Sequence, residues 1–166
     1  MRLIALALAG LLASTPAAAQ VWKEYAYPHH SITLAFPTDP KIETIRYQTI
    51  EGRAVDAQVY SVTQESGVLR LIVADFSRSA LNENAVTEDA IKRLKEGGDV
   101  KLDIVHRISQ LYGRQLSIAG RDGSHSFIAV FFHKKRLYLL EGKAASSNTT
   151  SEAIRFQQSL SFTDGG

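Results

Sequence analysis

The sequence contains no cysteine. This absence excludes a lipid-anchored cysteine behind a leader segment, a disulfide framework and any thiolate chemistry. Glycine and proline are also sparse, with 11 and 4 residues, whereas hydrophobic residues make up 45% of the chain. Such a composition excludes a disordered chain and is typical of a globular domain that is large enough to build a core without disulfides.

A charge excess of either sign is missing as well. The chain has 19 basic and 17 acidic residues, which leaves a net charge of +2, so nothing in the composition calls for nucleic acid as a partner. The sequence has no glycine-rich phosphate loop, no Gly-x-Ser-x-Gly elbow and no zinc or calcium-ligand spacing. We therefore expect no cofactor and no metal site.

The first residues have the pattern of a secretory signal peptide. Arg2 gives a positive start, Leu3 to Leu12 form an apolar run, and Ala17 to Ala19 provide small residues for a signal peptidase. We predict a signal peptide over 1–19 and one domain over 20–166, located in the periplasm or secreted; an uncleaved anchor is the alternative. No second apolar run approaches the length of a membrane span, so no transmembrane segment is expected after cleavage.

Alternating apolar residues predict strands in the first half of the remaining chain. The clearest alternation covers Ile32 to Phe36 and is stopped by Pro37. A weaker strand is expected over 42–50. The segments 55–60 and 68–76 alternate around a short polar turn and predict a hairpin.

The period then changes to that of a helix. From Asn84 to the Gly97-Gly98 pair, apolar residues fall on one helical face, and Asn84 or Thr87 is expected to cap the start. A second helix is expected near the end of the chain, with Thr149 and Glu152 as a capping box. Its predicted apolar stripe consists of Ala153, Phe156 and Leu160.

Between the two helices the sequence predicts a meander of strands over 100–108, 114–119, 127–132 and 137–141. Asp122-Gly123 predicts a two-residue hairpin turn, because glycine accepts a positive φ. The segment 127–132 is apolar on both faces, as expected for a central strand covered on both sides. The order of elements predicts the α+β class, with an antiparallel-rich sheet and helices packed on it.

Three of these segments resemble a known group of proteins. They are Tyr27-Pro28 with Ser31 to Pro37, the strand pair of 120–132 and 136–140, and the ending Ile154-Arg155-Phe156 with Ser159 to Phe162. Together they resemble uncharacterised exported bacterial proteins with a PsbP-like α/β/α sandwich, a fold named after an extrinsic subunit of the photosynthetic oxygen-evolving complex. The resemblance implies an accessory or assembly role without catalysis, and it brings no functional residues with it.

The candidate catalytic and metal-ligating residues are explained by structural roles in turns and strands. Ser124-His125 beside Asp122 suggests a nucleophile and base, but turn chemistry explains these neighbours. The histidines have no ligand spacing, and the adjacent His29 and His30 are expected to point to opposite sides of an extended segment. His106 is interpreted as a partly buried, hydrogen-bonded strand residue. The full set of histidines is His29, His30, His106, His125 and His133.

Two surface features are candidate contact sites. Lys134, Lys135 and Arg136, at a predicted turn tip, could contact an anionic partner such as a lipid head group or an acidic protein patch. The alternative is a solvated tip that keeps the adjoining strands apart from other chains. Trp22, Tyr25 and Tyr27 could form an aromatic contact surface, or they could pack the first segment onto the domain.

These features favour an exported, non-catalytic binding or assembly module, whose partner could be an envelope protein or an anionic surface. An enzyme with a site assembled only by the fold is the alternative, with His106 and Asp103 as first suspects. A pocket with converging polar groups and a perturbed histidine would favour that enzyme. A small-ligand carrier is a third possibility and would need an enclosed apolar cavity.

Overall fold

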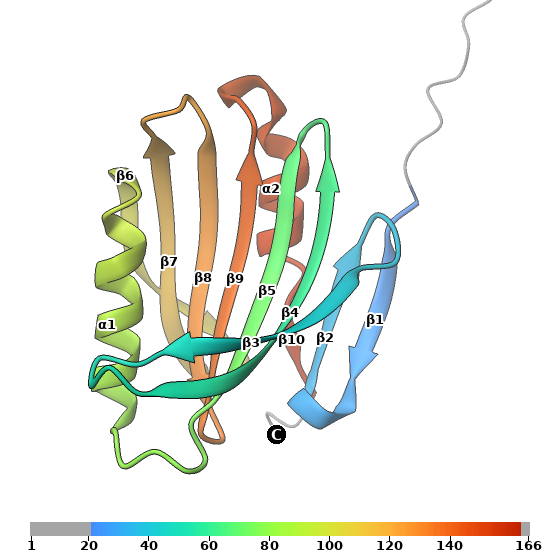
Figure 1. Ribbon diagram of the computed structural model, residues 1–166. Helices are drawn as coiled ribbons and strands as arrows, with labels where there is room; N and C mark the ends of the chain where they lie inside the picture. Colours follow the sequence, from blue (N-terminus) through green and yellow to red (C-terminus); the bar gives the residue numbers. More distant parts are fainter. Residues whose placement is uncertain (1–20, 164–166) are drawn as a thin grey trace, which may run out of the picture.

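The computed structural model describes residues 21–163, so the predicted signal peptide lies outside the described residues. A seven-stranded antiparallel sheet in the order β3-β4-β5-β9-β8-β7-β6 forms the centre, and a three-stranded sheet in the order β1-β2-β10 lies beside it (Figure 1). The strands are β1 (Lys23–Tyr27), β2 (Ile32–Phe36), β3 (Lys41–Gln48), β4 (Ala54–Gln64), β5 (Gly67–Asp75), β6 (Gly98–Ile108), β7 (Leu111–Gly120), β8 (His125–His133), β9 (Arg136–Ala144) and β10 (Ser161–Phe162).

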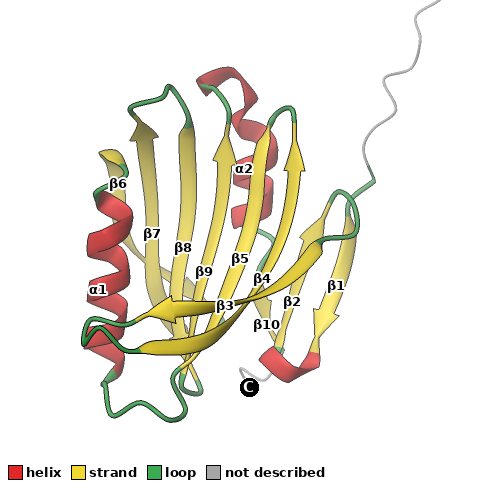
Figure 2. Cartoon of the chain, viewed as in Figure 1, coloured by secondary structure: helices red, strands yellow, loops and turns green. Residues whose placement is uncertain are grey.

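Helices and the small sheet cover the two faces of the large sheet. Helix α1 (Glu83–Lys95) packs on one face, while α2 (Thr150–Gln157) and the small sheet pack on the other (Figure 2). Two 3₁₀ helices, η1 (Pro28–His30) and η2 (Ser147–Thr149), connect neighbouring elements. The predicted α+β class is confirmed, and the small sheet is an addition that the sequence did not predict. Within the described residues, no helix has the length and apolar character needed to cross a membrane.

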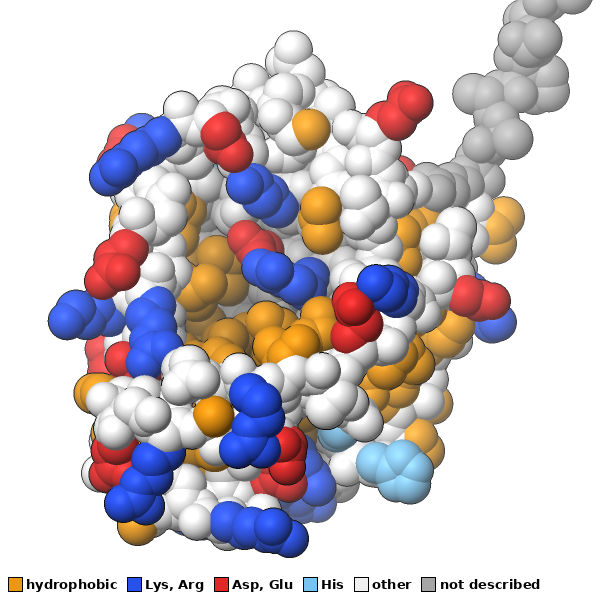
Figure 3. All heavy atoms as spheres, viewed as in Figure 1, with side chains coloured by type: hydrophobic (Ala, Val, Ile, Leu, Met, Phe, Trp, Pro, Cys, Tyr) orange, Lys and Arg blue, Asp and Glu red, His pale blue; other side chains and the backbone are white. Residues whose placement is uncertain are grey.

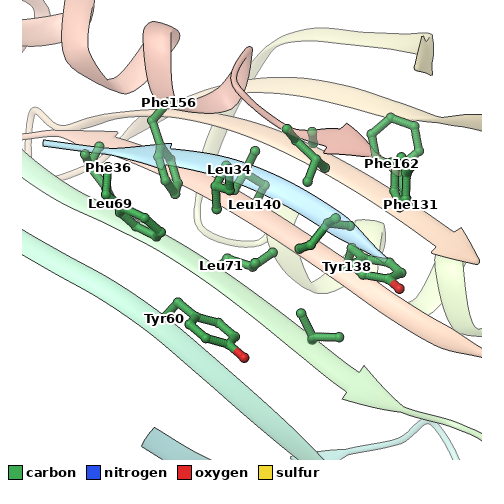
Figure 4. Packing of buried hydrophobic residues seen from close by; sticks show 14 of the residues in the cluster. Leu34, Phe36, Tyr60, Leu69, Leu71, Phe131, Tyr138, Leu140, Phe156 and Phe162 are labelled. Atoms are coloured by element: carbon green, nitrogen blue, oxygen red, sulfur yellow. The ribbon is translucent and has the colours of Figure 1, made fainter. Parts of the chain in front are cut away.

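Each face of the large sheet has its own hydrophobic core, because apolar side chains alternate along its strands. Beneath α2 and the small sheet, Phe131, Tyr138 and Phe156 are fully buried (Figure 4). Beneath α1, Leu116 and Ile128 belong to a second core. β8 contributes to both cores and lies between β7 and β9, so the prediction of a central strand covered on both faces is confirmed.

The helix starts differ from the sequence predictions. Asn82, rather than Asn84 or Thr87, caps α1 and accepts a hydrogen bond of 2.8 Å from the Ala85 N–H. The capping box expected from Thr149 and Glu152 is wrong, because Ser146 and Thr149 form a capping box on η2. The Glu152 carboxylate instead accepts a hydrogen bond from the Ser66 hydroxyl, a contact between distant parts of the chain that local pattern cannot anticipate.

Two further predictions are corrected. Leu160 lies beyond the end of α2, although its side chain is buried as expected. The turn at Asp122-Gly123 has three loop residues rather than two, because the Gly120 N–H donates to the Ser124 carbonyl at 2.8 Å. Gly123 takes the left-handed position with φ of 82°, which is the geometry of a turn followed by a one-residue bulge.

Candidate functional site

The β8–β9 turn carries the basic cluster predicted from the sequence. His133 and Arg136 are paired across the two strands, so Lys134 and Lys135 alone form the turn. Both lysines are exposed and both have positive φ, 47° and 60°. A two-residue turn of this kind favours Asn-Gly, because other residues pay roughly 1–2 kcal/mol each for the left-handed backbone. The two lysines therefore lower the stability of the fold relative to an Asn-Gly turn at the same position.

Left-handed backbone in non-glycine residues is confined to one end of the large sheet. Among the described residues, Ser31, Ser109, Lys134 and Lys135 adopt it. The strand registers place the β6–β7 and β8–β9 turns at the same end, and η1 lies there too (Figure 1). Unfavourable backbone conformations that gather in one place are a reason to look for function there.

We call this part of the molecule the basic end and define it by His29, His30, Lys134, Lys135 and Arg136. Figure 3 shows basic side chains along the lower border of the molecule, with histidine side chains near the same border. Next to the two lysines lies an open cavity of about 510 Å³. It is lined by Glu83, Gln110, Leu111, Tyr112, Phe132, His133, Lys134 and Lys135.

His30 joins η1, and with it the basic end, to β4 and β9. The Tyr138 hydroxyl donates to the His30 carbonyl at 2.8 Å, which ties η1 to β9. The His30 Nε2 atom lies 2.9 Å from the Gln58 Oε1 atom and 2.9 Å from the Tyr60 hydroxyl. Its Nδ1 atom is buried without a hydrogen-bond partner. The structure thus brings His30 and Arg136 into one region, although they lie far apart in the sequence.

Burial and the nearby charges set the protonation of this region. Burial lowers the pKa of His30, and the Arg136 charge lowers it further, while the hydrogen bond with Gln58 opposes the shift. Asp75 lies opposite Arg136 in the sheet. Partial burial alone would raise the pKa of Asp75, but hydrogen bonds from Ser77 and the charges of Arg136 and Arg78 hold it below its usual value. His30 is therefore neutral at pH 7, and Asp75 is charged.

The three predicted aromatic contacts pack against the domain. The Tyr27 ring lies 4.4 Å from the Tyr60 ring, and the Tyr25 ring stacks on Tyr27 at 6.5 Å between centroids. The Trp22 ring lies under the Arg155 guanidinium at 4.6 Å. All three aromatic side chains are half-buried against the core beneath the small sheet. This arrangement supports the packing alternative, and Tyr27 also brings the aromatic set close to His30 through Tyr60.

The candidate catalytic residues are not brought together. The Ser124 hydroxyl donates to Asp122, whereas the His125 Nε2 atom lies 2.7 Å from the Ser117 hydroxyl. His29 and His30 lie in the 3₁₀ helix η1, so the expectation of an extended segment is wrong. The described residues contain no group of three or more His, Asp or Glu side chains placed to hold a metal ion.

The first enzyme suspects, His106 and Asp103, lie on opposite faces of β6. The Asp103 carboxylate contacts Lys95 of α1 and Arg114. The His106 ring packs 5.7 Å from the Phe131 ring, which belongs to the core on the other face. Burial lowers the pKa of His106. The predicted partial burial of His106 is confirmed, whereas its predicted side-chain hydrogen bond is not found among the described residues. No catalytic pair forms between His106 and Asp103.

The other cavities have mixed polar and apolar linings. Figure 3 shows a hollow on the face that carries α1, with apolar side chains inside it and charged side chains around it. At the β3–β4 loop, a cavity of about 320 Å³ is lined by three arginines and three carboxylates, namely Arg46, Arg53, Arg78, Glu51, Asp56 and Asp75. Another, of about 340 Å³, includes Asp122, Glu141 and Lys143. Neither is the enclosed apolar cavity that a small-ligand carrier would need, because both are open and have charged side chains in their lining.

Sequence reasoning found the basic turn but missed its neighbours. Tyr112 and Gln110 reach the lysines because the β6–β7 and β8–β9 turns lie at one end of the sheet. The sequence signal that could have located this turn is the polar pair Ser109-Gln110. It lies between Ile108 at the end of β6 and Leu111 at the start of β7, which pair with each other. His30 gave no such signal, because its side-chain partners lie 28 and 30 positions away.

Comparisons with known proteins support the fold alone. No protein-family model matches the chain, and no curated protein matches it. The structure is similar to the solution structure of cyanobacterial PsbP (CyanoP) from Synechocystis sp. PCC 6803, with a TM-score of 0.56 and 11% sequence identity. The match covers 92% of this chain and 99% of that one. The predicted PsbP-like fold is therefore confirmed, whereas membership of a group of exported bacterial proteins stays a prediction.

Proposed function

We propose that this protein is a non-catalytic binding or assembly module that acts outside the cytosol and docks on an anionic surface through its basic end. The observation that carries the proposal is the Lys134-Lys135 turn, in which two lysines occupy left-handed positions. A sequence selected only for folding would place Asn-Gly there. Retaining the two charges at a cost in stability is explained by a contact that needs them.

The surroundings of the turn support an anionic partner. Lys134 and Lys135 are exposed, and Arg136 and two histidines of η1 lie at the same end of the sheet. Positive side chains gathered at a protruding tip attract anionic head groups at roughly 1 kcal/mol each near a charged surface. The exposed ring of Tyr112 borders the same cavity, and tyrosine is suited to the boundary between polar and apolar surroundings.

Co-sedimentation with lipid vesicles tests this function. The wild-type protein is expected to sediment with phosphatidylcholine vesicles that contain phosphatidylglycerol, to stay in solution with phosphatidylcholine alone, and to be released by salt. The double substitution Lys134→Asn and Lys135→Gly is expected to abolish sedimentation, because it removes both charges and leaves a favourable turn.

A matched control removes two lysines elsewhere. Lys41 and Lys101 are exposed and lie on the two edge strands, β3 and β6. Their replacement by asparagine changes the net charge by the same amount, so sedimentation should persist. Equal sedimentation of both double variants would contradict the proposed role of the basic end. Gentle crosslinking in envelope extract would then show whether an acidic protein is the partner instead.

A further inference from the structure

β6 is an edge strand of the large sheet, and no described strand pairs with its outer side. Three apolar side chains stand exposed on it: Leu102 is 37% exposed, Ile104 45% and Val105 65%. A long edge with free backbone groups and exposed apolar side chains is a template for pairing with another chain. Monomeric proteins usually block such an edge.

The other edge strand, β3, exposes apolar side chains as well, Ile42 at 58% and Ile45 at 37%, but charged residues alternate closely with them. β3 carries Lys41, Glu43 and Arg46 within eight residues, and charged side chains discourage edge pairing. β6 has an irregularity between Val100 and Leu102, which disrupts pairing only in its first part. The seven residues from Leu102 to Ile108 continue in regular register with β7, so this half of the edge remains open.

We propose that this open half is a homodimer interface, in which β6 of a second copy pairs antiparallel around a two-fold axis at Val105. The two sheets would then continue into one. Val105 then lies opposite Val105 of the second copy, Ile104 opposite His106, and Leu102 opposite Ile108. Apolar groups therefore meet on both faces of the joined sheet. Asp103 faces Arg107 twice, which places opposite charges directly across the interface.

Neighbouring registers are less favourable. An axis at Ile104 places Lys101 opposite Arg107, and an axis at Asp103 places that carboxylate opposite itself. Both put like charges across from each other, which destabilises strand pairing. An axis at His106 forms no opposite-charge pair. An axis at Leu102 also pairs apolar groups and opposite charges, but it runs across the irregularity between Val100 and Leu102. Among the axes within the regular half, only that at Val105 combines apolar and charge complementarity, which favours this register.

The neighbours of β6 leave room for a second copy. The buried residues of α1 belong to the core over the inner strands of the large sheet rather than to its β6 edge. Arg107 lies over the Tyr112 ring at 6.0 Å, which holds its guanidinium on the α1 face, where Asp103 also lies. None of the basic-end residues takes part, so this interface can fail or hold independently of the proposed docking function.

Engineered cysteines test the register, because the chain has none of its own. Val105→Cys places two thiols opposite each other at the axis and is expected to form a disulfide-linked dimer under mild oxidation. Ile42→Cys is the matched control, since Ile42 is 58% exposed but lies on β3, at the opposite edge of the sheet. We expect crosslinking of Val105→Cys to be at least about tenfold faster. Equal rates for the two variants would overturn the proposed register.

Sedimentation velocity tests the interface without crosslinking. The wild-type protein should show reversible, concentration-dependent dimers. Val105→Lys places two ammonium groups opposite each other and should weaken the dimer by about tenfold or more, while the exposure of Val105 lets the fold tolerate the change. A wild-type protein that stays monomeric at every concentration, or a Val105→Lys variant that dimerises equally well, would contradict the proposal.

Discussion

The turns at the two ends of the large sheet place different residues at positions with positive φ. At the end formed by the β4–β5 and β7–β8 turns, glycine takes the positive φ positions, Gly67 at 147° and Gly123 at 82°. At the basic end, serine and lysine take four of them, beside a single glycine, Gly52 at 74° in the β3–β4 turn. Glycine is the residue that folding alone would select there. The difference indicates that the glycine end is optimised for stability, whereas the basic end keeps side chains that folding does not require.

Substitution at the glycine end should have the largest effect. A Cβ atom added at Gly67 would lie 1.9 Å from the Lys143 carbonyl oxygen, a backbone atom of the neighbouring strand. Gly67→Ala therefore combines a steric clash with an unfavourable φ, and we expect a loss of about 3 kcal/mol in the free energy of unfolding. Urea denaturation followed by circular dichroism measures it. A loss below about 1 kcal/mol would mean that this turn rearranges easily and would weaken the comparison.

Substitution at the basic end should have the opposite sign. The double change Lys134→Asn and Lys135→Gly relieves two left-handed lysines, and we expect it to raise the free energy of unfolding by about 1 kcal/mol. The same variant is expected to lose vesicle binding, so stability and binding should change in opposite directions. Urea denaturation of the wild type and the variant measures the gain.

A control at the glycine end isolates the backbone contribution. Gly123 has open space around it, so Gly123→Lys introduces a left-handed lysine without a clash and should cost about 1 kcal/mol. It also adds a positive charge at the wrong end of the sheet and should leave vesicle binding unchanged. If the basic-end double variant were less stable than wild type, the two lysines would contribute contacts that outweigh their backbone cost.

The sequence predicts the individual strands of the large sheet better than the contacts between segments that are distant in the chain. Period-two alternation gives β2 and β6, and the apolar run of 127–132 gives the central strand β8, because burial on one or both faces leaves a local pattern. Lys134 and Lys135 stand out as a charged pair between two apolar strands. Their left-handed backbone was not predicted, because lysine, unlike glycine or asparagine, does not indicate a position with positive φ.

Long-range contacts left no local signal. The small sheet forms because β10, at the end of the chain, pairs with β2 near its start, and neither strand alone specifies this partner. The same holds for the His30 contacts with Gln58 and Tyr60 and for the Ser66 hydrogen bond to Glu152. A site that combines residues from η1, β4 and β9 therefore had to await the structure.

The smallest predicted effect is that of pH, which should change the stability of the fold and vesicle binding in opposite directions. Burial lowers the pKa of His30, His106 and His133 in the folded protein. The unfolded chain then binds protons at a higher pH, near 6.5, so stability is fully present above that pH and is lost as the pH falls toward the lowered values. Asp75 and Asp103 have lowered pKa values and titrate below this window.

His30→Gln should reduce this loss, because glutamine keeps a hydrogen-bonding group beside Gln58 and Tyr60 but does not titrate. Urea denaturation between about pH 7 and pH 5 measures the difference from wild type. At the lower pH at which His30 and His133 become protonated in the folded protein, the added positive charge beside Lys134 and Arg136 should strengthen vesicle binding while stability declines. A wild type whose stability and binding both weaken toward pH 5 would place the anionic contact away from these histidines, and the contrast between the two ends would then rest on the lysine turn alone.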